Sequence, residues 1–220
     1  MSDGRPFILV LAGVNGAGKS SLGGAAVHEA GLTWFNPDTV ARSAMDDTGM
    51  SQQEANAYAW GAGVDQLKQA IVERTNFAFE TTLGGNTVTR ILTEASASHD
   101  LQIWYCGLKS PELHIQRVAE RVALGGHDIP EEKIRERWLH SISNLIKLLD
   151  YTTELQVFDN STQAADGEDI PEPILVLHWQ DGHVLEPDRG DPATMAEVPD
   201  WAKPIVMAAF DLAAKLQKAG

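Results

Sequence analysis

Short apolar runs alternate with helix-like segments along most of the chain. Five runs have the length and composition of buried strands, at residues 7–12, 33–35, 77–83, 101–108 and 155–159. The segments between them repeat apolar residues at helical spacing, as at 19–30, 39–45, 51–75, 111–124 and 131–149. Strands and helices that alternate in this order predict an α/β fold, with a parallel sheet of about five strands flanked by helices.

The pattern changes after residue 162. Acidic residues and prolines gather in 163–173, which predicts a loop, and two short β-type runs then flank Asp181-Gly182. An Asp-Gly pair between such runs favours a hairpin with a tight primed turn. An amphipathic helix is expected over 201–218. We therefore expect a core domain at 1–162 and a C-terminal hairpin and helix at 163–220 that pack on the same domain.

Composition narrows the classes of partner. The chain has 220 residues, of which 43% are hydrophobic, so a single α/β domain with additions and a real core is expected. The formal charge of -14 repels polyanions, which argues against nucleic-acid and anionic-membrane binding. No apolar run approaches the ~20 residues of a membrane span. The single cysteine, Cys106, excludes an intrachain disulfide and fits a buried position in a cytoplasmic protein.

The segment from Gly13 to Ser20 fits the pattern G-x-x-x-x-G-K-[ST] between a predicted strand and a predicted helix. In such a P-loop the glycines let backbone N–H groups surround phosphate oxygens, Lys19 reaches the β and γ phosphates, and the Ser20 hydroxyl ligates Mg²⁺. ATP, with GTP as the alternative, and Mg²⁺ are the expected ligands. The expected nucleotide-binding residues are Gly13, Asn15, Gly16, Ala17, Gly18, Lys19, Ser20 and Ser21, joined by Arg117 further along the chain.

Asp38 follows the second predicted strand, whose carboxyl end should lie beside the P-loop. A carboxylate there can orient an acceptor hydroxyl and take its proton during phosphoryl transfer. The alternative is that Asp38 caps the helix that follows. Arg42, one turn later, could bind a substrate phosphate or pair with Asp38 in solvent.

Glu80 lies within or at the end of the third apolar run. A buried carboxylate is costly unless it is paired or binds a ligand. Glu80 and Thr82 share one face of a strand and could together hydrogen-bond substrate hydroxyls. An internal ion pair between Glu80 and an arginine is the alternative.

Two arginine-bearing helices around residues 117–137 predict a lid. Arg117 and Arg121 lie four positions apart on one helix face, where an anionic ligand would relieve their repulsion. Gly125-Gly126 provides a hinge, and His127 follows it. Asp128 and Glu131 resemble a capping box for the second helix. Arg135 and Arg137 lie off the apolar stripe of that helix, and ordinary solvated arginines remain the alternative.

These motifs together resemble the zeta toxin-like P-loop kinases over about residues 7–161. The resemblance rests on the glycine loop, on Asn36-Pro37-Asp38, on Phe79-Glu80-Thr81-Thr82, and on the segment from Arg121 through Gly125-Gly126-His127-Asp128-Ile129-Pro130 to Arg135. It implies a five-stranded parallel sheet related to nucleotide kinases, with ATP and Mg²⁺. The toxin members phosphorylate a sugar hydroxyl of UDP-N-acetylglucosamine, and an antitoxin protein is an expected partner of such a chain.

The resemblance also implies roles for individual residues. Asp38 corresponds to the base, and Glu80 with Thr82 corresponds to the pair that contacts the sugar. Toxin members grip the phosphates with two lid arginines at a fixed spacing. At that spacing the second position falls near His127 when Arg117 or Arg121 is the first, so the lid departs from the toxin pattern.

Two functions are consistent with the sequence. The first is an ATP-dependent kinase that transfers the γ-phosphate to a hydroxyl of a small molecule, with UDP-N-acetylglucosamine or another nucleotide sugar as the candidate acceptor and with Asp38, Lys19 and Arg121 as catalytic residues. The second is a P-loop ATPase or nucleotide-dependent switch that acts through a protein partner. A switch usually needs an aspartate at the end of an apolar strand to hold Mg²⁺. Asp159, at the end of the fifth run, is the residue that keeps this second function open.

Overall fold

The computed structural model describes residues 4–19, 22–23, 34–163 and 171–219. Within these residues, seven strands form one sheet in the order β2-β3-β1-β4-β5-β6-β7. They are β1 (Phe7–Ala12), β2 (Trp34–Phe35), β3 (Phe77–Thr81), β4 (Asp100–Gly107), β5 (Glu154–Asp159), β6 (Ile174–Gln180) and β7 (His183–Glu186). Strands β1 to β5 run parallel, which confirms the predicted α/β class.

The sheet is wider than expected. The C-terminal hairpin does not pack on the sheet as a separate addition, because β6 pairs antiparallel with β5 and β7 pairs antiparallel with β6. Seven strands therefore replace the expected five. Asp181 and Gly182 between β6 and β7 have φ values of 47° and 85°, as the predicted primed turn requires.

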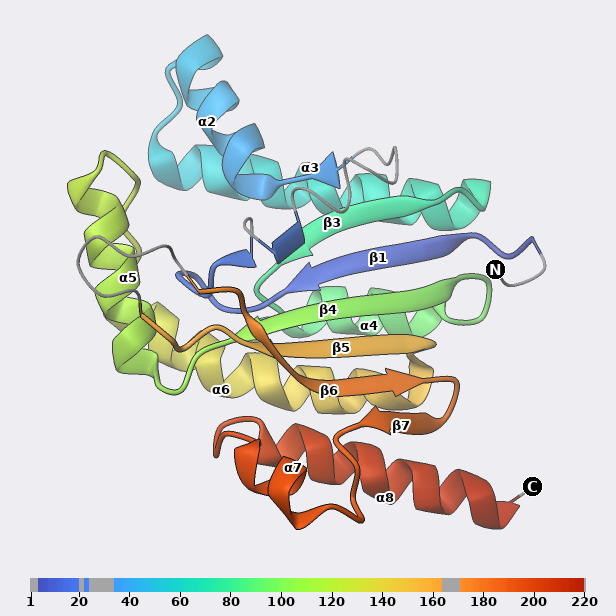
Figure 1. Cartoon of the computed structure of the whole chain (residues 1–220). Coiled ribbons are helices and arrows are strands. Elements are labelled where there is room, and N and C mark those ends of the chain that lie inside the picture. Colours follow the sequence, from blue (N-terminus) through green and yellow to red (C-terminus); the bar gives the residue numbers. More distant parts are fainter. Residues whose placement is uncertain (1–3, 20–21, 24–33, 164–170, 220) are drawn as a thin grey trace.

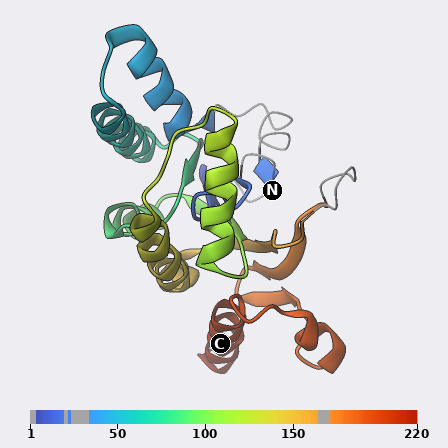
Figure 2. The same ribbon diagram turned by 90° about the vertical axis from the view of Figure 1, so that its left-hand side faces the viewer.

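Helices cover the sheet and its carboxyl edge (Figure 1). They are α2 (Pro37–Thr48), α3 (Gln52–Glu73), α4 (Asn86–Ala95), α5 (Pro111–Ala123), α6 (Glu131–Leu148), the 3-10 turn η1 (Leu149–Tyr151), α7 (Pro192–Glu197) and α8 (Lys203–Ala219). Figure 2, which looks toward the carboxyl ends of the parallel strands, shows α5 crossing in front of them. Among the helices that the structure describes, none is long and apolar enough to span a bilayer.

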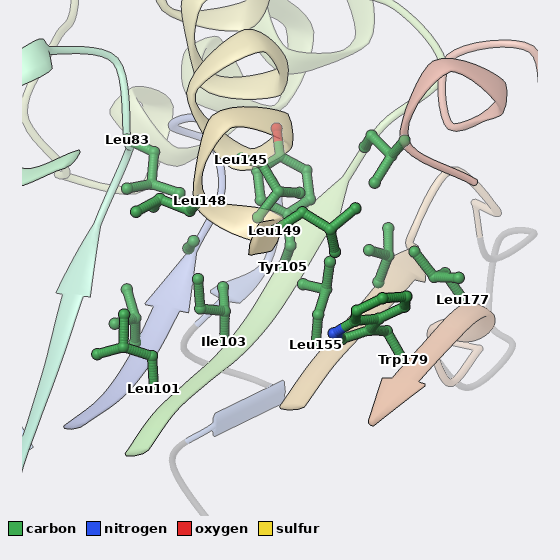
Figure 3. Packing of buried hydrophobic residues seen from close by; sticks show 14 of the residues in the cluster. Leu83, Leu101, Ile103, Tyr105, Leu145, Leu148, Leu149, Leu155, Leu177 and Trp179 are labelled. Carbon is green, nitrogen blue, oxygen red and sulfur yellow. The ribbon is translucent and has the colours of Figure 1, made fainter. Parts of the chain in front are cut away.

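The main core lies between the sheet and the helices α3, α4, α6 and α8. Leu145 and Leu148 of α6, with Leu149 just after it, pack over Ile103 of β4 and Leu155 of β5 (Figure 3). Burial of these side chains supplies the hydrophobic driving force that fixes α6 on the sheet. Helix α6 therefore anchors the lid segment to the sheet.

Helix ends differ from the prediction at one lid position. Ser110 caps α5 as expected, because its hydroxyl accepts a hydrogen bond from the Leu113 amide. Asp128 does not form the predicted capping box with Glu131, since α6 starts after Pro130 and has no side-chain cap. The Asp128 carboxylate instead accepts from the neighbouring Ile129 amide.

Candidate functional site

The P-loop follows β1 directly, and its carbonyl oxygens are held by side chains from other elements. Asn160 Nδ2 donates to the Ala17 carbonyl at 2.9 Å, and His114 Nδ1 contacts the Asn15 carbonyl at 2.8 Å. Gly16 has a φ of 81°, and a Cβ there would lie 2.8 Å from the His114 carbonyl. Glycine is needed at this position for both reasons. Ser20 and Ser21 lie outside the described residues.

His114 is buried beneath this loop and is neutral. Burial lowers the pKa of its imidazole to about 4, and the nearby positive charges of Lys19 and Arg117 act in the same direction. The contact with the Asn15 carbonyl requires the proton on Nδ1, which leaves Nε2 as a buried atom without a partner among the described residues. His114 is thus a support for the loop that sequence reasoning missed.

Cys106 occupies the buried position predicted for it. Its Sγ donates to the Ala17 carbonyl at 3.0 Å, and burial raises the pKa of the thiol to about 12. A thiol protonated at neutral pH is a poor nucleophile. Cys106 therefore belongs to the packing under the loop and not to its chemistry.

Lys19 and Glu80 form an ion pair within the site. Lys19 Nζ lies 3.3 Å from Glu80 Oε1, and the two side chains are only 7% and 12% exposed. Asn36 Nδ2 donates to the other Glu80 oxygen at 3.1 Å. The sequence allowed an internal ion pair between Glu80 and an arginine. In the structure the partner of Glu80 is the P-loop lysine, Lys19.

Asp38 lies in the first turn of α2, and the alternative role of helix cap is wrong for it. Asn36 is the cap, because its Oδ1 accepts from the amides of Asp38 and Thr39. The Asp38 carboxylate is 43% exposed and stands between two lid residues. Its oxygens lie 3.9 Å from Arg121 Nη1 and 3.8 Å from His127 Nε2.

The other predicted substrate residues are placed differently. Thr82 lines the larger of two cavities, although its hydroxyl also accepts from the Gly84 amide. Arg42 is exposed on α2, and it is absent from the described residues that line either cavity. The structure therefore brings Thr82 to the site but not Arg42.

The lid arginines have separate environments. Arg121 donates to the His127 carbonyl, which joins the end of α5 to the hinge segment, while Arg117 donates to the Thr162 carbonyl. Arg135 is absent from the described residues that line either cavity, and it pairs with Glu112 on the surface at 2.6 Å. Arg117 and Arg121 both line the smaller cavity.

The sequence names Arg137 only as one of the lid arginines, and the structure places it at the P-loop. Its Nη1 donates to Asn15 Oδ1 of the P-loop at 2.7 Å, and burial lowers the pKa of its guanidinium. The signal was a polar stripe on α6, in which Arg137, Ser141 and Asn144 recur at helical spacing. Ser141 donates to the Thr82 carbonyl and Asn144 to the Leu83 carbonyl, so this stripe fastens α6 to the loop after β3.

Two cavities meet at the carboxyl edge of the sheet. The smaller encloses about 240 Å³ beside the P-loop, and the larger encloses about 430 Å³ between the P-loop, α3, β3 and the lid. Among the residues that the structure describes, four line both cavities: Asn15, Lys19, Asp38 and Glu80. The wall that holds the candidate catalytic groups is therefore shared by both spaces.

The Asp159 carboxylate makes hydrogen bonds within the fold. Its Oδ1 accepts from Ser161 Oγ at 2.5 Å and from Trp201 Nε1 at 2.9 Å. It is not among the described residues that line either cavity. The residue that kept the switch alternative open thus binds the C-terminal segment.

A glycine loop after the first strand of a parallel sheet, at the carboxyl edge where two cavities meet, is typical of the P-loop kinase-like class of α/β proteins. The model of the Zeta toxin family matches residues 1–166, and the chain belongs to this family. An uncharacterized protein of Haemophilus influenzae is 28% identical over 133 residues, which cover 57% of this chain and 88% of that protein. Family membership supports a nucleotide-dependent phosphotransferase.

Solved structures share the fold. The structure of the PezAT toxin-antitoxin system of Streptococcus pneumoniae superposes with a TM-score of 0.53 at 16% identity, covering 72% of this chain and 69% of that chain. The structure of AvrRxo1-ORF1:-ORF2 with ATP gives a TM-score of 0.64 at 17% identity, covering 90% of this chain and 66% of that chain. At these identities the likeness concerns the fold alone.

Proposed function

We propose that the protein is an ATP-dependent kinase that transfers the γ-phosphoryl group to a hydroxyl of a small molecule. The observation that carries this proposal is the shared wall of the two cavities, which contains Lys19, Asp38 and Glu80. A phosphate-binding space and an acceptor space must meet where the phosphoryl group is transferred. A simple ATPase has no need of the second space.

Each of the site residues has its own proposed role in the reaction. Asp38 orients the acceptor hydroxyl and takes its proton as the oxygen bonds to the γ-phosphorus and the bond to the β–γ bridging oxygen breaks. Lys19, Arg121 and Arg137 neutralise the charge on the transferring group and on the ADP that leaves. Glu80 and Thr82 hold the acceptor. For Glu80 to hold the acceptor, the Lys19 side chain moves away from Glu80 and toward the phosphates.

The loop conformation and the buried lysine fit a nucleoside triphosphate. Ser20 is the residue proposed to ligate Mg²⁺, which when bound would add charge neutralisation at the phosphates. ATP is the proposed phosphate donor, and GTP is the alternative. Turnover measured with each nucleotide in parallel decides between them. The proposed catalytic residues are Asp38, Lys19 and Arg121.

A protein partner is also proposed. The neighbours named above include a toxin-antitoxin system and a two-component complex. By family membership we propose that an antitoxin protein binds this chain and blocks one of the cavities. A cytoplasmic location remains a proposal from the sequence.

The test is acceptor-dependent turnover of ATP with and without a panel of hydroxylated metabolites, read by mass spectrometry, with UDP-N-acetylglucosamine assayed first. Asp38→Asn should lower kcat by roughly 10²- to 10⁴-fold with nearly unchanged affinity for ATP. Asp47→Asn, at an exposed position of the same helix, is the matched control and should retain full activity. Full activity of Asp38→Asn would exclude the base role. Stimulation by cell protein but by no metabolite would favour the switch.

A further inference from the structure

Among the described residues, the charged side chains that line the larger cavity are all gathered at one end. Lys19, Asp38 and Glu80 belong to the wall shared with the smaller cavity. Arg137 is tied to that wall by its hydrogen bond to Asn15, and His127 is tied to it by its contact with Asp38. Every ionisable side chain known to line the larger cavity therefore lies at, or contacts, the shared wall.

The rest of the lining that the structure describes is neutral. Its inner part is formed by four buried side chains, Phe35, Val64, Leu67 and Phe79, with exposed fractions of 6%, 8%, 1% and 5%. Its outer part includes Trp60, Asn56 and Thr87, which are exposed. No lysine or arginine occurs in the sequence of residues 1–3, 20–21, 24–33, 164–170 or 220, so those segments cannot add such a cation.

This charge distribution is unsuited to an acceptor that carries its own phosphates. A diphosphate in a partly apolar site must be compensated by several charge-assisted hydrogen bonds, usually from arginine or lysine. The cations at the shared wall are already needed for the phosphates of the donor. The amino end of α4 lies near, since Gly84, Gly85 and Thr87 line the cavity, but a helix end contributes only about half a charge.

Resting on the kinase function proposed above, we infer that the part of the acceptor that does not react is uncharged and partly apolar. The acceptor is a neutral hydroxyl compound with an apolar or planar portion, and not a nucleoside diphosphate sugar. Its reacting hydroxyl lies at Asp38 and Glu80. Its apolar portion contacts the wall of Phe35, Val64 and Leu67, with Trp60 at the mouth.

Trp60 offers a matched pair of variants. Tyr58 and Trp60 lie on the same helix and are 55% and 54% exposed, but only Trp60 is among the described residues that line the cavity. Trp60→Ala should lower kcat/KM for the acceptor by roughly tenfold or more, because an aromatic contact is lost. Tyr58→Ala should leave it unchanged. Neither change should alter the affinity for ATP.

The deciding experiment compares compounds that differ by phosphate groups, namely N-acetylglucosamine with UDP-N-acetylglucosamine, uridine with UDP, and phenyl glucoside with its 6-phosphate. Binding is measured by calorimetry with a non-hydrolysable ATP analogue at saturation, which prevents phosphorylated compounds from binding the P-loop. Product is measured separately by mass spectrometry with ATP. We expect detectable binding for at least one neutral member, at least about tenfold tighter than for its phosphorylated partner.

The two readouts separate the inference from the function on which it rests. Tighter binding of a phosphorylated member, or no binding of any neutral member, overturns the inference. An equal loss of binding in Trp60→Ala and Tyr58→Ala also contradicts it. If neutral compounds bind and Trp60→Ala weakens them, but no phosphorylated product forms, the inference about the ligand stands and the kinase function fails.

Discussion

The Nζ atom of Lys19 lies 3.3 Å from the Oε1 atom of Glu80, in the wall that the two cavities share. Both side chains are largely buried, and Asn36 holds the second Glu80 oxygen. Without nucleotide, Glu80 is thus the counter-charge of the P-loop lysine. Under the proposed function, phosphates that bind the loop would compete with this carboxylate, and their binding would free Glu80 for the acceptor.

Glu80→Gln should destabilise the free protein and enhance its stabilisation by ATP. The variant leaves Lys19 as a buried charge without its partner, at a cost of roughly 3 kcal/mol in the free energy of unfolding. For a domain of this size that lowers Tm by roughly 6 to 12 °C. Bound phosphates restore a counter-charge, so the increase in Tm with ATP should exceed that of the parent protein.

Thermal unfolding with and without ATP measures both effects. Glu94→Gln is the control, because it removes the acid of an exposed pair with Arg90, whose side chains are 64% and 63% exposed. Exposed pairs contribute little, so its Tm should hardly change. An ATP-induced increase in Tm that is smaller in Glu80→Gln than in the parent would show that Glu80 does not compete with the phosphates.

Arg137→Gln should reduce turnover much more than Arg135→Gln. Arg137 donates to Asn15 of the P-loop, whereas Arg135, two positions earlier, pairs with Glu112 on the surface. Loss of a preorganised charge at the transferring phosphoryl group should lower kcat by roughly 10- to 10³-fold. Steady-state kinetics with a phosphorylated acceptor product as readout measures the difference. Equal activities of the two variants would remove Arg137 from the site.

The positions of the strands could be predicted because buried parallel strands are continuous apolar runs. Helix α4 was missed, since Gly84-Gly85 and the polar residues after it mask the helical spacing of Ile91, Leu92 and Ala95. The width of the sheet could not be read from the hairpin signal. Such a signal fixes the turn between β6 and β7, but not the strand on which the hairpin pairs.

Parts of the candidate site could be predicted from the sequence where a residue lies at the end of a predicted strand. Asp38 was expected beside the P-loop because parallel strands share one carboxyl edge. Glu80 was expected to bind a ligand or an ion partner because a lone buried carboxylate is costly. The sequence does not distinguish Asn36 from Asp38 as the cap of α2, because both residue types suit that role. The lid could not be resolved, since its four arginines differ in what they contact across the fold and not in their local sequence.

Stability should fall in mild acid through His114. Its pKa in the folded protein is about 4, below the ordinary value near 6.5, because the ring is buried. Above pH 6.5 the ring is neutral in both states. As the pH falls from 6.5 to 4 the unfolded chain binds a proton that the native ring does not, and stability decreases by roughly 3 kcal/mol.

Urea unfolding at pH 7 and pH 4.5 measures this dependence. His114→Gln keeps an N–H that can donate to the Asn15 carbonyl but removes the titration, so its stability should vary less between the two pH values. His140→Gln, at an exposed position, should keep the pH dependence of the parent. An identical pH dependence in all three proteins would refute the assignment to His114.

Two glycines of α3 should respond oppositely to alanine. A Cβ at Gly63 would lie 2.6 Å from the Phe35 ring, which is buried in the wall of the larger cavity, whereas a Cβ at Gly61 meets nothing within 4 Å among the described atoms. Gly61→Ala should stabilise the helix by roughly 0.5 to 1 kcal/mol. Gly63→Ala gains the same helix propensity but forces the ring to move, at a net cost of about 1 to 2 kcal/mol. Urea unfolding measures both changes in stability. Because Phe35 forms part of the apolar wall, Gly63→Ala should also weaken acceptor binding, whereas Gly61→Ala should leave it unchanged. Stabilisation by both substitutions would mean that the Phe35 ring can move aside without cost.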